Sequence, residues 1–145
     1  MKKRRIVAFS ILTLVVLLGV IMFSAFFVQP PEKYYALSVS SVNEECLVGQ
    51  EFEVTASIKN KSLVSSRVIR GFNFIYINMY PAGNEDRVDV PAIAVSDMFW
   101  AFENKTETVK FTPQQAGEYS IEIYGSFSIR DKSYKFFQVK HIHAV

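Results

Sequence analysis

The sequence predicts an all-β domain, a sandwich of two antiparallel sheets with about seven strands, preceded by one transmembrane helix. Residues 6–28 form a single uncharged apolar run, and the chain beyond it alternates polar and apolar side chains in short runs separated by turn residues. Half of the 145 residues are hydrophobic and 14% are aromatic, which is too apolar for a disordered chain. The single cysteine, Cys46, excludes an intrachain disulfide framework.

The apolar run is long enough to span a bilayer. Its 23 residues would form a helix of about 34 Å, and a hydrocarbon core is ~30 Å thick. Pro30 and Pro31 would end this helix because neither has a backbone N–H. A cleaved signal peptide is the alternative, but its apolar region is shorter, and Phe23 stands where cleavage after Ala25 needs a small residue. We therefore favour an uncleaved signal anchor.

A basic cluster before the apolar run predicts the orientation of the chain. It consists of Lys2, Lys3, Arg4 and Arg5. Under the positive-inside rule residues 1–5 stay in the cytoplasm, residues 6–28 cross the plasma membrane, and a linker at 29–33 leads to an extracytoplasmic domain at 34–145. The rest of the chain holds 12 basic and 14 acidic residues, so no nucleic-acid-binding surface is expected.

The first strands of the domain have the clearest alternation. Residues 51–59 predict a half-buried strand with Phe52, Val54, Ala56 and Ile58 on the inward face. Residues 35–41 predict an edge strand with Leu37 and Val39 inward. Residues 68–80 are apolar on both sides, which is typical of a strand buried on both faces or of one with an exposed aromatic face. One side would carry Phe72, Phe74, Tyr76 and Tyr80, and the other Ile75, Ile77 and Met79.

Four further strands are expected after the turn at 81–86. Residues 88–95 predict a weak edge strand interrupted by Pro91, and residues 106–111 predict another short strand. Residues 118–124 predict a strand with Tyr119, Ile121 and Ile123 on one face. A polar turn at 130–133 leads to the last strand at 134–141.

Two segments resemble immunoglobulin-like sandwiches. Residues 111–123, with Pro113, Gly117 and Tyr119, look like the corner between strands E and F, where a tyrosine hydrogen-bonds back across the turn. Residues 48–54 resemble the start of strand B. The pair is similar to filamin-type repeats, fibronectin type III modules and bacterial cell-adhesion-related domains. Cys46 has no partner in strand F and Trp100 lies outside strand C, unlike antibody domains, which favours a bacterial origin.

The side chains that could act in catalysis or metal binding match no catalytic motif. His141 and His143 would share one side of a strand, but no spaced third ligand accompanies them, so a solvated strand is favoured over a metal site. Glu44 and Glu45 would raise the pKa of the Cys46 thiol, which makes it a poor nucleophile. We interpret the acidic group at Glu85, Asp86, Asp89 and Asp97 as a solvated turn rather than a calcium site. No cofactor is expected.

Two other short patterns concern the surface. Asn60 and Asn104 each begin an N-glycosylation acceptor pattern in a predicted loop. The run 98–102 is too apolar for a solvated loop, so it either enters the core or forms an exposed patch for a partner or the nearby membrane. Tyrosines on neighbouring strands could form a second aromatic surface that binds a partner. The candidate partner-binding residues are therefore Met98, Phe99, Trp100, Phe102, Tyr76, Tyr80 and Tyr124.

These observations predict a non-catalytic binding module held at the membrane, with an extracellular or envelope protein or glycan as partner. The alternative is a small accessory subunit that docks on a larger membrane complex through residues 6–28. A third hypothesis, an enzyme or metal-dependent protein that uses His141, His143 or the acidic turn, has no motif in its favour.

Overall fold

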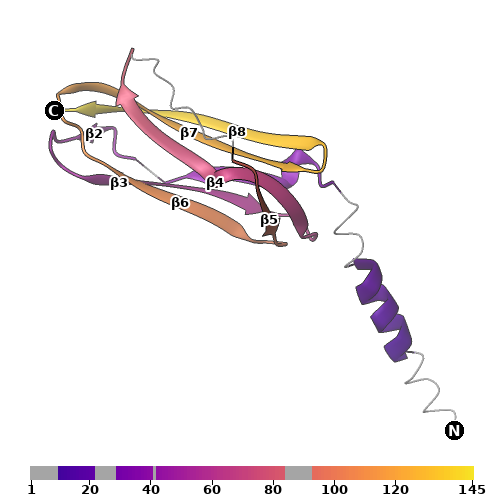
Figure 1. Ribbon diagram of the computed structural model, residues 1–145. Coiled ribbons are helices and arrows are strands. Elements are labelled where there is room, and N and C mark those ends of the chain that lie inside the picture. The colour runs from indigo at the N-terminus through magenta and orange to yellow at the C-terminus, as the bar shows by residue number, and fades with distance from the viewer. Residues whose placement is uncertain (1–9, 22–28, 41, 84–92) are drawn as a thin grey trace, which may run out of the picture.

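Two sheets pack face to face in the computed structural model, which describes residues 10–21, 29–40, 42–83 and 93–145 (Figure 1). One sheet has three strands in the order β1-β3-β6, and the other has five in the order β2-β8-β7-β4-β5. The elements are η1 (Glu32–Tyr34), β1 (Tyr35–Val39), β2 (Glu45–Cys46), β3 (Phe52–Asn60), β4 (Ser66–Pro81), β5 (Val95–Phe99), β6 (Asn104–Phe111), β7 (Gly117–Ile129) and β8 (Lys132–Ala144).

The strand order confirms an immunoglobulin-like sandwich. In such folds strands A, B and E form one sheet, while G, F and C form the other with C′ at its edge. Here β1, β3 and β6 take the places of A, B and E, and β8, β7, β4 and β5 take those of G, F, C and C′. All neighbouring strands pair antiparallel except the short β2, which runs parallel to β8. The sequence did not predict β2, because two residues are too few to show alternation.

The core forms where the predicted alternation turns apolar side chains inward. Val54, Ala56 and Ile58 of β3 are fully buried against Ile121 and Ile123 of β7, as the sequence predicted. Leu37 and Val39 of β1 pack at its margin. At one end the core is aromatic and consists of Tyr35, Phe74, Phe99, Phe127 and Tyr134, whose neighbouring ring centroids lie 5.0–5.8 Å apart. Edge-to-face and offset contacts at such distances are favourable for aromatic quadrupoles.

A β-bulge in β4 corrects the predicted face of one residue. The register of β4 against β7 shifts between Arg70 and Ile75, so Phe74 and Ile75 are both buried although they are adjacent. Phe72, which strict alternation placed beside Phe74, is instead 62% exposed. Residues 71–74 of β4 stand here against the single residue Ser126 of β7, so the alternation of β4 starts afresh beyond the bulge. In the rest of β4, Tyr76 and Tyr80 lie on the face opposite Ile75 and Ile77 and are half-buried, so this strand has one buried face and one partly exposed aromatic face.

The remaining strand boundaries differ modestly from the prediction. Residues 88–92 of the expected strand at 88–95 lie outside the described residues, and Ile93 and Ala94 are irregular. The edge strand β5 begins at Val95, the last residue of the expected strand, and continues to Phe99 in the apolar run at 98–102. β7 and β8 both extend further than expected and meet in a tight turn at Arg130 and Asp131.

The register places four segments at one end of the sandwich, here called the proximal end. They are the chain entrance at 29–34, the β3–β4 loop at 61–65, the β5–β6 turn at 100–103 and the β7–β8 turn at 130–131. Residues 42–51 and 112–116 lie at the opposite, distal end with the C-terminus (Figure 1). Chain segments far apart in sequence therefore share each end.

Residues 10–21 are helical, and their apolar side chains are exposed. The described part of the chain contains no helix that is both long and apolar enough to cross a bilayer. The run predicted to span the membrane, residues 6–28, extends beyond this helix at both ends into residues outside the description.

Candidate functional site

Three aromatic side chains stand side by side on the outer face of the five-stranded sheet. Tyr76 of β4 is the register partner of Tyr124 of β7, which is the partner of Phe137 of β8. All three lie opposite the core-facing residues of their strands, and Phe137 is 61% exposed. We call this set the aromatic row. No described strand or helix packs over it (Figure 1).

The row joins two of the predicted tyrosines and places the third nearby. Tyr80 lies on the same face four residues beyond Tyr76, opposite Ser120, with Asn78 between the two tyrosines. Phe137 was not among the predicted residues. Its signal was present in the sequence, because alternation from Tyr134 places residues 135, 137 and 139 on one face.

The β-bulge fixes the position of Tyr76. The Tyr76 hydroxyl accepts a hydrogen bond from the backbone N–H of Asn73 at 3.1 Å. A Cβ at Gly71 would lie only 2.7 Å from that hydroxyl oxygen, so the lack of a side chain at Gly71 leaves room for the Tyr76 side chain. The bulge and this glycine thus fix the position of the ring at one end of the row.

The run 98–102 is divided between the core and the surface, the two alternatives that the sequence left open. Phe99, the last residue of β5, is fully buried in the aromatic core, whereas Trp100 and Phe102 in the following turn are 56% and 57% exposed. Met98 is half-buried on the outer face beside Arg67. Phe102 has a φ of 61°, in the left-handed region that costs an ordinary side chain energy. An exposed aromatic residue is therefore held in a conformation better suited to glycine or asparagine.

Asn60 anchors this turn from inside the protein. Its buried Nδ2 donates to the carbonyl oxygens of Trp100 at 2.9 Å, Val64 at 3.2 Å and Phe99 at 3.3 Å. Its Oδ1 accepts from the backbone N–H and the hydroxyl of Ser62. Glycosylation of Asn60 is thus incompatible with the fold, which corrects the expectation of a loop site. Asn104 begins β6 and is exposed.

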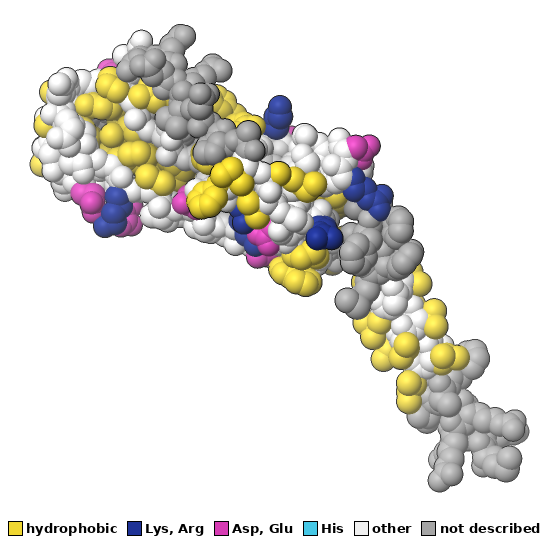
Figure 2. Space-filling view, in the orientation of Figure 1, with side chains coloured by type: hydrophobic (Ala, Val, Ile, Leu, Met, Phe, Trp, Pro, Cys, Tyr) yellow, Lys and Arg dark blue, Asp and Glu magenta, His cyan; other side chains and the backbone are white. Residues whose placement is uncertain are grey.

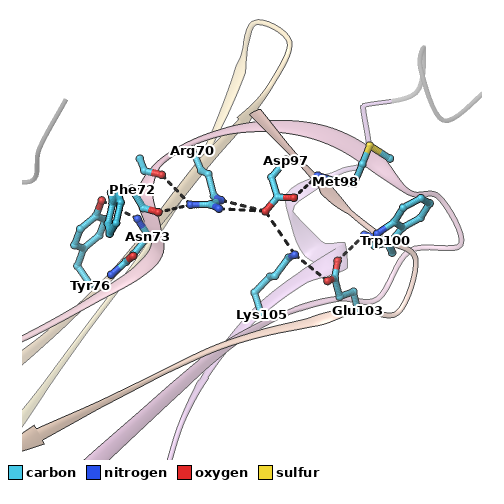
Figure 3. Close-up of polar contacts among 10 residues, drawn as sticks. Arg70, Phe72, Asn73, Tyr76, Asp97, Met98, Trp100, Glu103 and Lys105 are labelled. Atoms are coloured by element: carbon cyan, nitrogen blue, oxygen red, sulfur yellow. Dashed lines mark hydrogen bonds and ion pairs between the residues drawn. The ribbon is translucent and has the colours of Figure 1, made fainter. Parts of the chain in front are cut away.

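A charged cluster of Arg70, Asp97, Glu103 and Lys105 braces the same turn (Figure 3). Asp97 accepts from Arg70 at 3.2 Å, and Lys105 lies 2.8 Å from Glu103, whose other carboxylate oxygen accepts from the Trp100 backbone N–H at 2.8 Å. Arg70 also donates to the carbonyl oxygens of Gly71 and Phe72 in the bulge. The cluster therefore links the bulge beneath Tyr76 to the turn that carries Trp100.

The Asp97 carboxyl is stabilised in its ionised form by this cluster. Burial opposes its ionisation, but the hydrogen bond from the backbone N–H of Met98 and the charges of Lys105 and Arg70 outweigh burial and lower its pKa. Of the acidic group noted in the sequence, Asp97 thus serves in an ion-pair network. Glu85, Asp86 and Asp89 lie outside the described residues.

His141, His143 and Cys46 lie in the distal half of the sandwich, on β8 and β2. His143 lies 2.7 Å from a Glu118 carboxylate oxygen, and His141 lies 3.3 Å from the Ser120 hydroxyl. Both line a groove of about 480 Å³ on the distal half, but no group of three or more metal-ligating side chains occurs in the described chain. Burial raises the pKa of the Cys46 thiol. The sequence predicted the same direction, but from the negative charges of Glu44 and Glu45.

The tyrosine corner implied by the resemblance is present. The Tyr119 hydroxyl accepts from the backbone N–H of Gln115 at 3.3 Å and donates to its carbonyl oxygen at 3.0 Å. The hydrogen bonds close the turn between β6 and β7 at the distal end. The feature supports the fold and has no contact with the aromatic row.

Comparison with known proteins finds no matching family model and no matching curated protein. Among solved structures, a β-glucosidase from Listeria innocua aligns with 76% of this chain at 17% identity and a TM-score of 0.46; the chain spans 16% of that enzyme. PapD-like domain 7 of human CEP192 aligns with 81% of this chain and 89% of its own length at 11% identity and a TM-score of 0.47. The CARDB domain of PF1109 from Pyrococcus furiosus aligns with 77% and 94% at 16% identity and 0.46. The immunoglobulin-like assignment rests on the strand order and tyrosine corner of the chain itself.

Proposed function

We propose that this protein is a non-catalytic binding module anchored in the plasma membrane by residues 6–28, with residues 1–5 in the cytoplasm and the sandwich outside. Its partner is an envelope or extracellular protein or glycan. The aromatic row of Tyr76, Tyr124 and Phe137 carries the proposal. A planar array of half-exposed rings offers a large apolar contact area with little side-chain entropy to lose.

Two features of the row favour recognition over simple packing. The three rings follow strand register, so the sheet backbone sets their spacing, and hydrogen bonds at the bulge hold Tyr76. The polar neighbours on the same face, Asn78 and Glu122, form a register pair beside the row. An apolar centre with polar groups at its margin is the usual composition of a binding surface.

Site-specific photocrosslinking in native membranes tests the proposal. A photoreactive phenylalanine analogue at Phe137 of the full-length chain is expected to yield one discrete adduct. The double variant Tyr76→Ala/Tyr124→Ala is expected to abolish it, because it removes the two neighbouring rings. Sensitivity of the adduct to protease or to glycosidase then assigns the partner to proteins or to glycans.

Thr108, exposed on the three-stranded sheet, supplies the matched control position, and Thr55→Ala/Thr108→Ala the matched control variant. The same adduct at Thr108, or none at Phe137, contradicts the proposal. An adduct that survives the tyrosine substitutions but disappears when an unrelated apolar helix replaces residues 6–28 indicates an accessory subunit instead.

A further inference from the structure

The chain joins the sandwich with no free linker after the apolar run. Val28 ends the run, and the side chain of the next residue, Gln29, donates to the Asp131 carboxylate at 2.6 Å and to the Ile129 carbonyl oxygen at 3.4 Å. The Tyr134 hydroxyl donates to the carbonyl oxygen of Pro30 at 2.6 Å, and Pro30 itself is buried. Gln29 and Pro30, the first residues of the predicted linker at 29–33, are therefore hydrogen-bonded to the domain.

This attachment limits how far the domain can stand from a membrane. If the apolar run spans the bilayer, its last residue lies at the interface, and one residue spans at most about 3.6 Å. The proximal end, where Gln29 is bonded, must then lie at the membrane surface. The inference below rests on the proposed membrane anchoring.

The proximal end exposes large apolar side chains from two loops. Leu63 in the β3–β4 loop is 79% exposed, and Trp100 and Phe102 in the β5–β6 turn are each more than half exposed. The two loops are tied together, since the Ala101 backbone N–H donates to the Ser65 hydroxyl at 2.9 Å. Hydrophobic side chains are visible at this end of the domain in Figure 2. Tryptophan and phenylalanine are favoured at the boundary between lipid headgroups and acyl chains.

The two ends of the sandwich also differ in net charge. The proximal segments at 29–34, 61–65, 100–103 and 130–131 hold three basic and three acidic residues: Lys33, Lys61 and Arg130 against Glu32, Glu103 and Asp131. The distal segments at 42–51 and 112–116 hold three acidic residues and no basic ones: Glu44, Glu45 and Glu51. An anionic membrane surface therefore repels the distal segments, whereas the proximal segments carry no net charge that would oppose contact.

We propose that the proximal end is a membrane-docking surface, with Leu63, Trp100 and Phe102 inserted into the interface of the bilayer that holds the anchor. Asn60 and the charged cluster hold the two loops rigid, so the inserted side chains fix the orientation of the domain. The sandwich then stands with its long axis away from the membrane. The aromatic row, on the side of the sandwich, stays accessible to a partner.

The only tryptophan of the chain, Trp100, reports on this contact directly. The full-length protein is reconstituted into vesicles of phosphatidylcholine and phosphatidylglycerol, with and without bromine on the acyl chains. Bromine quenches tryptophan only on close approach. Trp100 is expected to lose most of its emission in the brominated vesicles. In Trp100→Phe/Val48→Trp, the single tryptophan lies at the exposed distal loop, and its emission is expected to be unchanged.

Flotation of the vesicles separates failure of the anchor from failure of the docking. Protein that does not float with the vesicles contradicts the anchor and with it the inference. Protein that floats but keeps its Trp100 emission in brominated vesicles overturns the docking alone, whether the tryptophan is solvated or covered by another copy of the chain. Quenching of both tryptophans also overturns the inference, because the domain then has no fixed orientation.

Discussion

Asn60 is the residue on which the loops of the proximal end depend. Its fully buried amide satisfies three backbone carbonyls and receives two hydrogen bonds from Ser62. No local pattern reveals this role, since two of the carbonyl partners, those of Phe99 and Trp100, lie 39 and 40 residues away. At this position the sequence suggested only an N-glycosylation acceptor site.

Substitution Asn60→Ala is expected to lower the free energy of unfolding by about 3 kcal/mol, because it removes the hydrogen bonds of the buried amide to three carbonyl oxygens and to Ser62. Denaturant unfolding of the purified full-length chain measures this. Asn104→Ala, which removes an exposed asparagine, is the control and should cost less than about 0.5 kcal/mol. Equal losses for the two variants would contradict the anchoring role.

Asp97 makes part of the stability depend on pH. Its pKa is lower in the folded protein than the ~3.9 of an unfolded aspartate, so the unfolded state binds more protons near that pH. The stabilisation is therefore present above about pH 4 and is lost as the pH falls through the folded pKa. One third of the side chain is exposed, so solvent screening limits the gain.

We expect Asp97→Asn to cost roughly 1 kcal/mol at neutral pH, and this cost to shrink as the pH falls below about 4 and through the lowered pKa of Asp97. The measurement is the difference between wild-type and variant unfolding free energies across this range. Glu51→Gln, which alters an exposed ion pair with Lys110, serves as the control with little effect at either pH. A difference that stays constant from neutral to acidic pH would disprove the ion-pair explanation.

At the scale of elements, the corner between β6 and β7 is the best example of a local signal that the structure confirms. The resemblance of residues 111–123 to an immunoglobulin-like corner implied the hydrogen bond of Tyr119 across the turn, and all the groups involved lie within a few residues of each other. β4 is the opposite case. Its bulge depends on pairing with β7, more than 40 residues later, and alternation within β4 could not reveal it.

Tyr119→Phe is expected to lower the free energy of unfolding by roughly 1–2 kcal/mol, since it removes two hydrogen bonds and leaves the ring packing intact. Thermal or denaturant unfolding tests this. The exposed Tyr34 supplies the comparison, and Tyr34→Phe should change stability very little. If both variants unfold alike, the corner contributes nothing measurable.

For the whole molecule, the sequence by itself determined the all-β class, the two-sheet sandwich and the inward faces of β3 and β7. These depend on short-range alternation and turn residues, which a single strand already displays. Only the tertiary structure decided that Phe99 is buried while Trp100 is exposed, that Phe72 leaves the face of Phe74, and that Tyr76, Tyr124 and Phe137 form one row. Each of these outcomes depends on which distant strand pairs with which and in what register, and cross-strand pairing is a property of the assembled sheet rather than of any one segment.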